Sequence, residues 1–229
     1  FNISLMQKSL WDLPYANCYF YQGYERIGIR GAKPTIERIE RFQLEKWVDN
    51  LEEATVLDIG ANCCFIGMEL AYKVKSVHCL EFNPYTLRIA HLVKKFLAIK
   101  NLEYELCDFY EWDTDKKYNV VLSLACHRTI DGKYRPELRD HFSKIWKLLS
   151  PNGILIFECH NAEKDSDGLI DSQTYFDILS YKVIERFVPS NDINKLVLIL
   201  RKKDFAEEFD NKFNLEKALK SREFELLES

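Results

Sequence analysis

Strand-like and helix-like segments alternate along the chain from residue 55 onward, and this alternation constrains the fold more than any other feature. Short apolar runs rich in Val, Ile, Leu and Phe are each followed by a longer segment with helical periodicity. Strands joined by helical crossovers run parallel, with helices covering the sheet. Two runs, NVVLSL and GILIFE, are almost continuously apolar, as expected of strands buried on both faces. The order predicts an α/β fold with a doubly wound, mostly parallel sheet.

The alternation changes after residue 160. Residues 171–180 are predicted to form one more helix, and residues 181–188 and 195–202 to form two strands. The segment PSNDIN between these strands is too short for a crossover, so the two strands should pair antiparallel. We therefore expect a seven-stranded, Rossmann-like sheet that ends in an antiparallel hairpin.

Three regions are expected. Residues 1–34 are aromatic and turn-rich, and should either close as a lid or pack over a sheet edge. Residues 35–203 form the α/β domain, beginning with an amphipathic helix over 35–50 that Thr35 caps. Residues 204–229 are charge-dense with regularly spaced Phe and Leu, which predicts a C-terminal helix that docks onto a partner or forms a homodimer.

Composition narrows the classes of partner and location. The net charge of −4 lacks the basic footprint of most nucleic-acid-binding proteins. The seven cysteines include no C-x-x-C pair, so they are expected to be reduced, buried thiols of a cytoplasmic protein rather than zinc ligands. We see no signal peptide, and no apolar run approaches the roughly 20 residues of a membrane span.

The stretch VLDIGANCCFIGMELA, residues 56–71, places a glycine turn between the first strand and its helix. Asp58 precedes the turn, and Gly60 allows the backbone to turn sharply and approach a ligand. Glu81 in CLEFN and Asp108 in ELCDF end the next two strands. Ligands of open α/β sheets bind outside the carboxyl ends of the strands, so these three acids should border one nucleotide site.

The turn, the acids on successive strands and the terminal hairpin together make residues 35–202 similar to the class I S-adenosylmethionine-dependent methyltransferases. The resemblance implies that Asp58 fixes the methionine end of S-adenosylmethionine and that Glu81 accepts the ribose hydroxyls. It implies that Asp108 accepts from the adenine amino group while Phe109 packs on the ring. The remaining predicted cofactor contacts are Arg30, Asn62, Phe65, Phe82 and Cys126. A nicotinamide cofactor is disfavoured because the turn lacks the full G-x-G-x-x-G.

Two positions of the turn depart from the family pattern, which has very small residues there. Asn62 is compatible because asparagine tolerates left-handed backbone geometry. Cys64 would crowd a ligand that came close to it. This departure supports an alternative in which the chain is a non-catalytic partner subunit.

Catalytic candidates follow the fourth and fifth strands. His127 is the predicted base, the alternative being a strand-end histidine bonded to the backbone. Glu158 and His160 should face the same way along a strand, either as catalytic groups or as a capping network, and we predict no metal site there. Three cations of the intervening loop could hold an anionic substrate or lie in solvent: Arg128, Lys133 and Arg135.

The methyl acceptor is indicated only by a looser resemblance. Residues 122–161 look like the corresponding region of Bin3-like methyltransferases, which act on RNA phosphates, and of methyltransferases of bacterial surface-polysaccharide clusters. The acidic balance favours a small or sugar-linked acceptor over nucleic acid, and the high Lys, Ile, Phe and Asn usage suggests an AT-rich bacterial genome. O-methylation of a small acceptor is therefore the leading hypothesis, and RNA or tRNA methylation is the alternative.

Overall fold

The computed structural model describes residues 20–127, 136–159, 161–188, 191–204, 214–220 and 225–226. The chain divides into two compact units, Phe1–Asp113 and Thr114–Ser229. Within the described residues, no helix has both the length and the apolar character needed to cross a membrane.

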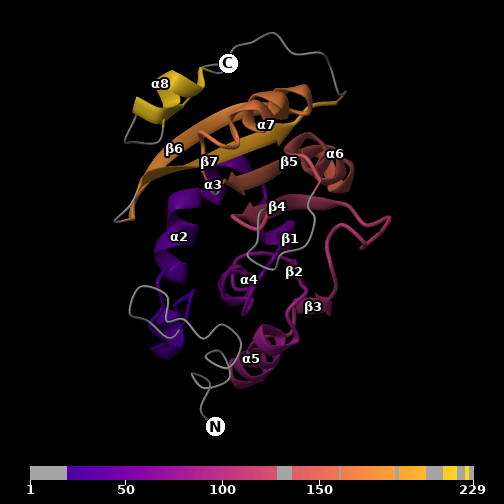
Figure 1. Cartoon of the computed structure of the whole chain (residues 1–229). Coiled ribbons are helices and arrows are strands. Elements are labelled where there is room, and N and C mark those ends of the chain that lie inside the picture. Colours follow the sequence, from indigo (N-terminus) through magenta and orange to yellow (C-terminus); the bar gives the residue numbers. More distant parts are fainter. Residues whose placement is uncertain are drawn as a thin grey trace. The chain divides into compact units, whose positions relative to one another are not determined.

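The first unit is built on three parallel strands in the order β3-β2-β1 (Figure 1). The strands are β1 (Thr55–Ile59), β2 (Ser76–Glu81) and β3 (Leu102–Leu106), connected by helices α4 (Phe65–Leu70) and α5 (Pro84–Phe96). Both crossovers step in the same direction, so the right-handed rule places α4 and α5 on the same face of these strands. The carboxyl ends of the three strands lie at one edge, as the sequence predicts.

The segment before β1 contains η1 (Glu25–Ile27), α2 (Thr35–Phe42), α3 (Leu44–Trp47) and η2 (Leu51–Glu53). The single helix predicted over residues 35–50 is wrong, because Gln43 has a left-handed backbone, with φ of 48°, and separates α2 from α3. The prediction that Thr35 caps this helix is also wrong. Pro34 occupies the cap position, and the Thr35 hydroxyl instead donates to the Gly23 carbonyl over 2.5 Å.

Helix α4 lies unusually close to strand β2. A Cβ atom at Gly67 would stand 2.6 Å from the Cys79 Sγ atom and 3.1 Å from a methyl of Val77, so a larger residue would force the helix away from the strand. All six residues of α4 are buried. The position of the helix, and of the turn that precedes it, is therefore fixed by tight packing.

The second unit contains β4 (Tyr118–Leu124), α6 (Leu138–Leu148), β5 (Leu149–Glu158), α7 (Ser166–Asp171), η3 (Ser172–Thr174), β6 (Phe176–Val188), β7 (Asn191–Lys202), α8 (Leu215–Lys220) and β8 (Glu225–Leu226). Strands β4 and β5 are parallel, and β7 lies antiparallel between β5 and β6 (Figure 1). The predicted terminal hairpin is confirmed. With the parallel pairs of both units, the predicted Rossmann-like α/β class is confirmed as well.

Two predicted elements of this unit differ. The helix predicted over residues 171–180 is wrong: α7 ends at Asp171, and β6 already begins at Phe176, which is fully buried and pairs with β7. Cross-strand pairing therefore overrides the local helical pattern. In the predicted C-terminal helix, the described residues form only the short α8 and then β8, which pairs with β6 at Ser180 and Tyr181.

Candidate functional site

The glycine turn folds back over the carboxyl end of β2. Gly60 has a φ of 67°, and its N–H and that of Ala61 both donate to the Leu80 carbonyl, over 2.9 and 3.0 Å. Asn62 and Cys64 also have left-handed backbones, with φ of 55° and 56°. The positive φ values explain the Gly and the Asn, since these residues adopt such geometry at least cost.

Cys64 is a bulkier residue in the same backbone geometry, and its thiol is turned into the core. It is fully buried and interacts with the Cys79 thiol of β2. Burial raises the pKa of the Cys63 and Cys79 thiols well above the ordinary value. The described cysteines are all free, in keeping with the predicted reduced thiols. The Cys64 side chain, which was expected to crowd a ligand, is therefore buried and interacts with strand β2.

Glu81 is fixed against this turn by two backbone donors. One carboxylate oxygen accepts from the Asn62 N–H over 2.6 Å, and the other accepts from the Asn83 N–H over 2.9 Å. These two contacts fix the orientation of the Glu81 carboxylate at the end of β2. The predicted partners Gly60, Asn62 and Glu81 are therefore brought together at one strand edge.

Asp58 is buried at the end of β1 with one unsatisfied oxygen. Its side chain is 2% exposed, and its Oδ2 atom has no hydrogen-bond partner among the described residues. Burial raises the pKa of the Asp58 carboxyl to about 7, against a lowering by Arg38 and a further raising by Glu81. A buried acceptor without a donor is costly, so this oxygen fits a donor that a ligand brings, such as an ammonium group.

The other predicted cofactor residues of this unit occupy varied environments. Asp108 is half-buried and accepts from the Tyr110 N–H over 3.0 Å, beside the buried ring of Phe109. Phe65 is fully buried, and Phe82 is half-buried. Arg30 is exposed, whereas Arg38, on α2, is buried and acts electrostatically on Asp58.

In the second unit, a polar network lies at the end of β4. The Ser123 hydroxyl is 2.9 Å from the His141 Nε2 atom and 3.3 Å from the Cys126 Sγ atom. The buried ring of His127 lies beside that of His141, with ring centroids 5.0 Å apart. The sequence predicts Cys126 and His127 as site residues but not Ser123 and His141. No motif distinguishes these two from ordinary residues of a strand and a helix.

Glu158, at the end of β5, is paired with a lysine. Its carboxylate is 3.2 Å from the Lys195 ammonium of β7, and the two residues are 2% and 3% exposed. His160 lies outside the described residues, as do Arg128, Lys133 and Arg135. Within the described part of the chain, no cluster of three His, Cys, Asp or Glu residues could hold a metal ion.

Three solved structures that share the fold of this chain are named as methyltransferases. The N-methyltransferase NodS from Bradyrhizobium japonicum, solved with S-adenosylhomocysteine, matches 73% of this chain and 88% of its own, with a TM-score of 0.57 and 15% identity. An rRNA methylase from Streptococcus thermophilus matches 76% of this chain and all of its own, with a TM-score of 0.55 and 19% identity. SMU.1697c from Streptococcus mutans, also solved with S-adenosylhomocysteine, matches 74% of this chain and 98% of its own, with a TM-score of 0.52 and 16% identity.

A family model also identifies the chain from its sequence. The model, described as a methyltransferase domain, matches residues 50–212 and so covers most of the chain, including the glycine turn, the polar network at the end of β4 and the terminal hairpin. The chain therefore belongs to the methyltransferase domain family.

Proposed function

We propose that this enzyme O-methylates a small acceptor, such as a sugar, phosphate or phosphoramidate group, in polysaccharide biosynthesis in the bacterial cytoplasm. The observation that carries the donor half of this proposal is the buried, unpartnered Oδ2 atom of Asp58 beside the Glu81-bound turn. S-adenosylmethionine supplies a methyl group on a sulfonium centre, so the protein mainly provides position and a proton acceptor.

The residues of the first unit fit such a donor. Asp58 would bind its ammonium group, Glu81 its ribose hydroxyls and Asp108 its adenine amino group. Two of these acids already have defined geometry, because backbone N–H groups fix Glu81 and Asp108 at their strand ends. Gly60 adds no side chain to the turn and has the left-handed backbone that glycine adopts at least cost.

We assign the base to His127. A neutral imidazole is the side chain best suited to take a proton near pH 7, and the buried His127 ring is supported by the ring of His141. In this proposal a ring nitrogen of His127 would accept the proton of an acceptor hydroxyl. S-adenosylmethionine would supply the methyl group to that oxygen and leave as S-adenosylhomocysteine. Glu158 is a weaker candidate for this task, because it already neutralises the buried Lys195.

The acceptor class rests on charge. The net charge of −4 favours a small or sugar-linked acceptor over a polyanion. The alternative of a non-catalytic subunit is weakened, because the Cys64 side chain that would crowd a ligand is fully buried.

His127→Ala is expected to lower the turnover rate at least about 100-fold while S-adenosylhomocysteine still binds, because general-base catalysis contributes that much to rate but nothing to donor binding. A survey of sugar, phosphate and phosphoramidate acceptors gives the turnover, and titration calorimetry gives the donor affinity. His91→Ala is the matched control, since this exposed histidine on α5 bonds only the Tyr104 hydroxyl among the contacts described for its side chain. Full activity in His127→Ala would remove the assigned base.

RNA methylation remains the second candidate, and helix α5 is the feature that favours it. No acidic residue occurs from Asn83 to Asn101, and the exposed side chains there include Arg88, Lys95, Phe96 and Lys100. Cations next to an aromatic side chain suit single-stranded RNA. Binding that weakens steeply with salt, and that Lys95→Ala and Lys100→Ala reduce, would favour RNA over the small acceptor.

A further inference from the structure

Residues 20–34, here called the strap, form a self-paired loop that precedes helix α2. Its backbone closes through bonds between Tyr24 and Ile29 in both directions, and the Gly23 N–H donates to the Lys33 carbonyl over 2.9 Å. A Cβ atom at Gly31 would overlap the backbone of Gly23, so the two limbs of the loop touch closely. The strap is therefore a small element with its own backbone hydrogen bonds.

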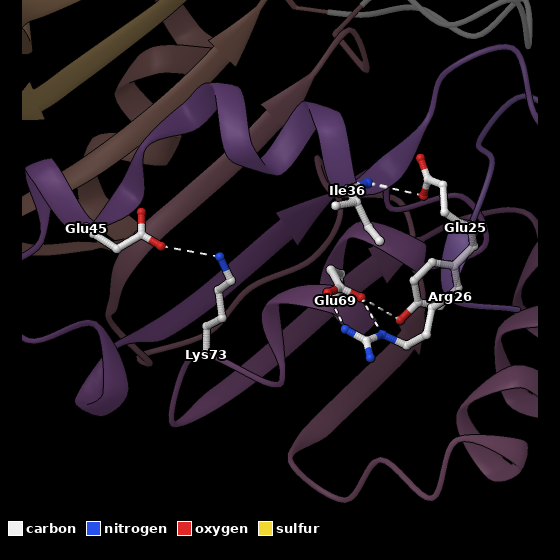
Figure 2. Close-up of polar contacts among 7 residues, drawn as sticks. Glu25, Arg26, Ile36, Glu45, Glu69 and Lys73 are labelled. Carbon is white, nitrogen blue, oxygen red and sulfur yellow. Dashed lines mark hydrogen bonds and ion pairs between the residues drawn. The ribbon is translucent and has the colours of Figure 1, made fainter.

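Two side chains of the strap hydrogen-bond to helix α4, and Figure 2 shows the contact between Arg26 and Glu69. The Arg26 guanidinium donates to both oxygens of Glu69, over 2.8 and 2.6 Å, and the Tyr24 hydroxyl donates to the same carboxylate over 3.2 Å. Arg26 also lies 4.3 Å above the Tyr72 ring. A bidentate, stacked guanidinium is a strong and directional contact. We call Tyr24, Arg26 and Glu69 the clasp.

The residue between Tyr24 and Arg26 contacts a different helix. The Glu25 carboxylate accepts from the Ile36 N–H over 3.2 Å, in the first turn of α2. The Thr35 hydroxyl, also in that turn, donates to the Gly23 carbonyl. Three consecutive strap residues thus tie the loop to α4 and α2, the helices next to the glycine turn and Asp58.

The clasp is placed where it can affect the glycine turn. Tyr24 is fully buried and stacks on Phe65, with ring centroids 5.2 Å apart and an interplanar angle of 26°. Phe65 is the first residue of α4 and directly follows Cys64, the last left-handed residue of the turn. Hydrogen bonding from Arg26 holds the pKa of the Glu69 carboxyl below its ordinary value, so the clasp is charged at neutral pH.

One strap side chain also has an unmet hydrogen bond. Gln22 is only 5% exposed, and its Oε1 atom has no partner among the described residues. It adjoins Gly23, which Thr35 contacts, and Arg38 lies one helical turn beyond Thr35 and acts electrostatically on Asp58. Gln22 Oε1 and Asp58 Oδ2 are therefore two buried acceptors without a hydrogen-bond donor among the described residues. Helix α2 contacts the neighbour of the first through Thr35 and acts on the second through Arg38.

We propose that the strap forms one wall of the site that binds S-adenosylmethionine. The Gln22 side chain accepts a hydrogen bond from S-adenosylmethionine there, and the clasp couples closure of the strap to the binding of S-adenosylmethionine. This inference rests on the proposed function of the Asp58 and Glu81 edge. A closed strap keeps Tyr24 on Phe65 and Gln22 in place, whereas an open strap loses both contacts. A donor that binds the closed form better must in turn stabilise the strap.

Glu69→Gln is expected to weaken S-adenosylhomocysteine binding roughly tenfold, as measured by titration calorimetry, because Arg26 loses the carboxylate that it pairs with. Gln22→Leu should weaken binding with little change in the melting temperature. Lys75→Met is the matched control: Lys75 forms an exposed ion pair with Glu53, 2.9 Å long, that includes no residue of the clasp. This control should leave binding within about twofold of wild type.

If closure of the strap favours ligand binding, then ligand binding must favour closure of the strap, and proteolysis can measure this second effect. S-adenosylhomocysteine should slow tryptic cleavage at the exposed Arg30 of the wild-type strap, and this protection should be lost in Glu69→Gln. If Glu69→Gln fails to fold, Arg26→Lys carries the test, because it keeps the charge but loses the paired hydrogen bonds. Two outcomes would show that the clasp only stabilises the fold: a variant with a lower melting temperature but wild-type affinity, or strap cleavage that the ligand does not slow. Either outcome would overturn the strap proposal and leave the donor site standing. A wild-type protein that binds no S-adenosylhomocysteine would overturn the donor site and the strap proposal together.

Discussion

Replacement of Asp58 by asparagine is expected to weaken S-adenosylhomocysteine binding about 100-fold, because a buried charge pair with the ligand ammonium is lost. The same change should raise the free energy of unfolding of the ligand-free protein at pH 8. The buried carboxyl has a pKa raised from 3.8 to about 7, which corresponds to about 4 kcal/mol of destabilisation of its ionised form. After the cost of burying an amide, a net gain of about 1 to 3 kcal/mol should remain.

The difference in free energy of unfolding between wild type and Asp58→Asn depends on pH. An acid whose pKa is raised in the folded state stabilises the protein at low pH, and this stability is lost as pH rises through the folded pKa. Wild type should therefore lose stability relative to Asp58→Asn between about pH 4 and pH 7, as followed by urea denaturation. Ligand affinity of wild type should rise over pH 6 to 8, and that of the variant should not. Equal affinity of both proteins at pH 8 would contradict the assignment of Asp58.

The buried pair of Glu158 and Lys195 carries the second large effect. Lys195→Met should lower the free energy of unfolding by about 3 to 5 kcal/mol, because the Glu158 carboxylate then remains buried without its ammonium partner. For a protein of 229 residues this corresponds to a fall of about 10 °C in the melting temperature. Glu158→Gln should cost a similar amount for the opposite charge.

The double variant Glu158→Leu with Lys195→Met separates structure from catalysis. Replacing both charges by apolar side chains should recover most of the lost stability, since the desolvation cost of both ions disappears. If the pair is structural, the double variant also recovers turnover. A stable double variant without turnover would instead return Glu158 to the catalytic role that the sequence suggested.

The central strands of the fold were predictable because the runs NVVLSL and GILIFE are almost continuously apolar, as strands buried on both faces are. The hairpin follows from a loop too short to cross over. The left-handed turn was also recognisable, because Gly60 and Asn62 are the residues that such a backbone favours.

The remaining errors and omissions concern contacts that no local pattern encodes. Tyr24 and Glu69 lie 45 residues apart, and Glu158 and Lys195 lie 37 apart, so neither pair leaves a periodic signal. Gln43 breaks a helix without a Gly or Pro to mark the position. At Phe176, pairing with β7 decides for a strand against the helical spacing of the residues around it.

The position of β7 between β5 and β6 also sets the order in which the second unit can assemble. Strand β6 leaves the ribosome before β7, yet its backbone reaches β5 only through β7. During synthesis, the apolar β5 consequently waits with an open edge until residues 191–202 have emerged. An apolar strand with an unpaired edge is prone to pair with another chain, so slower translation over residues 191–202 is expected to favour self-association of the unfinished second unit.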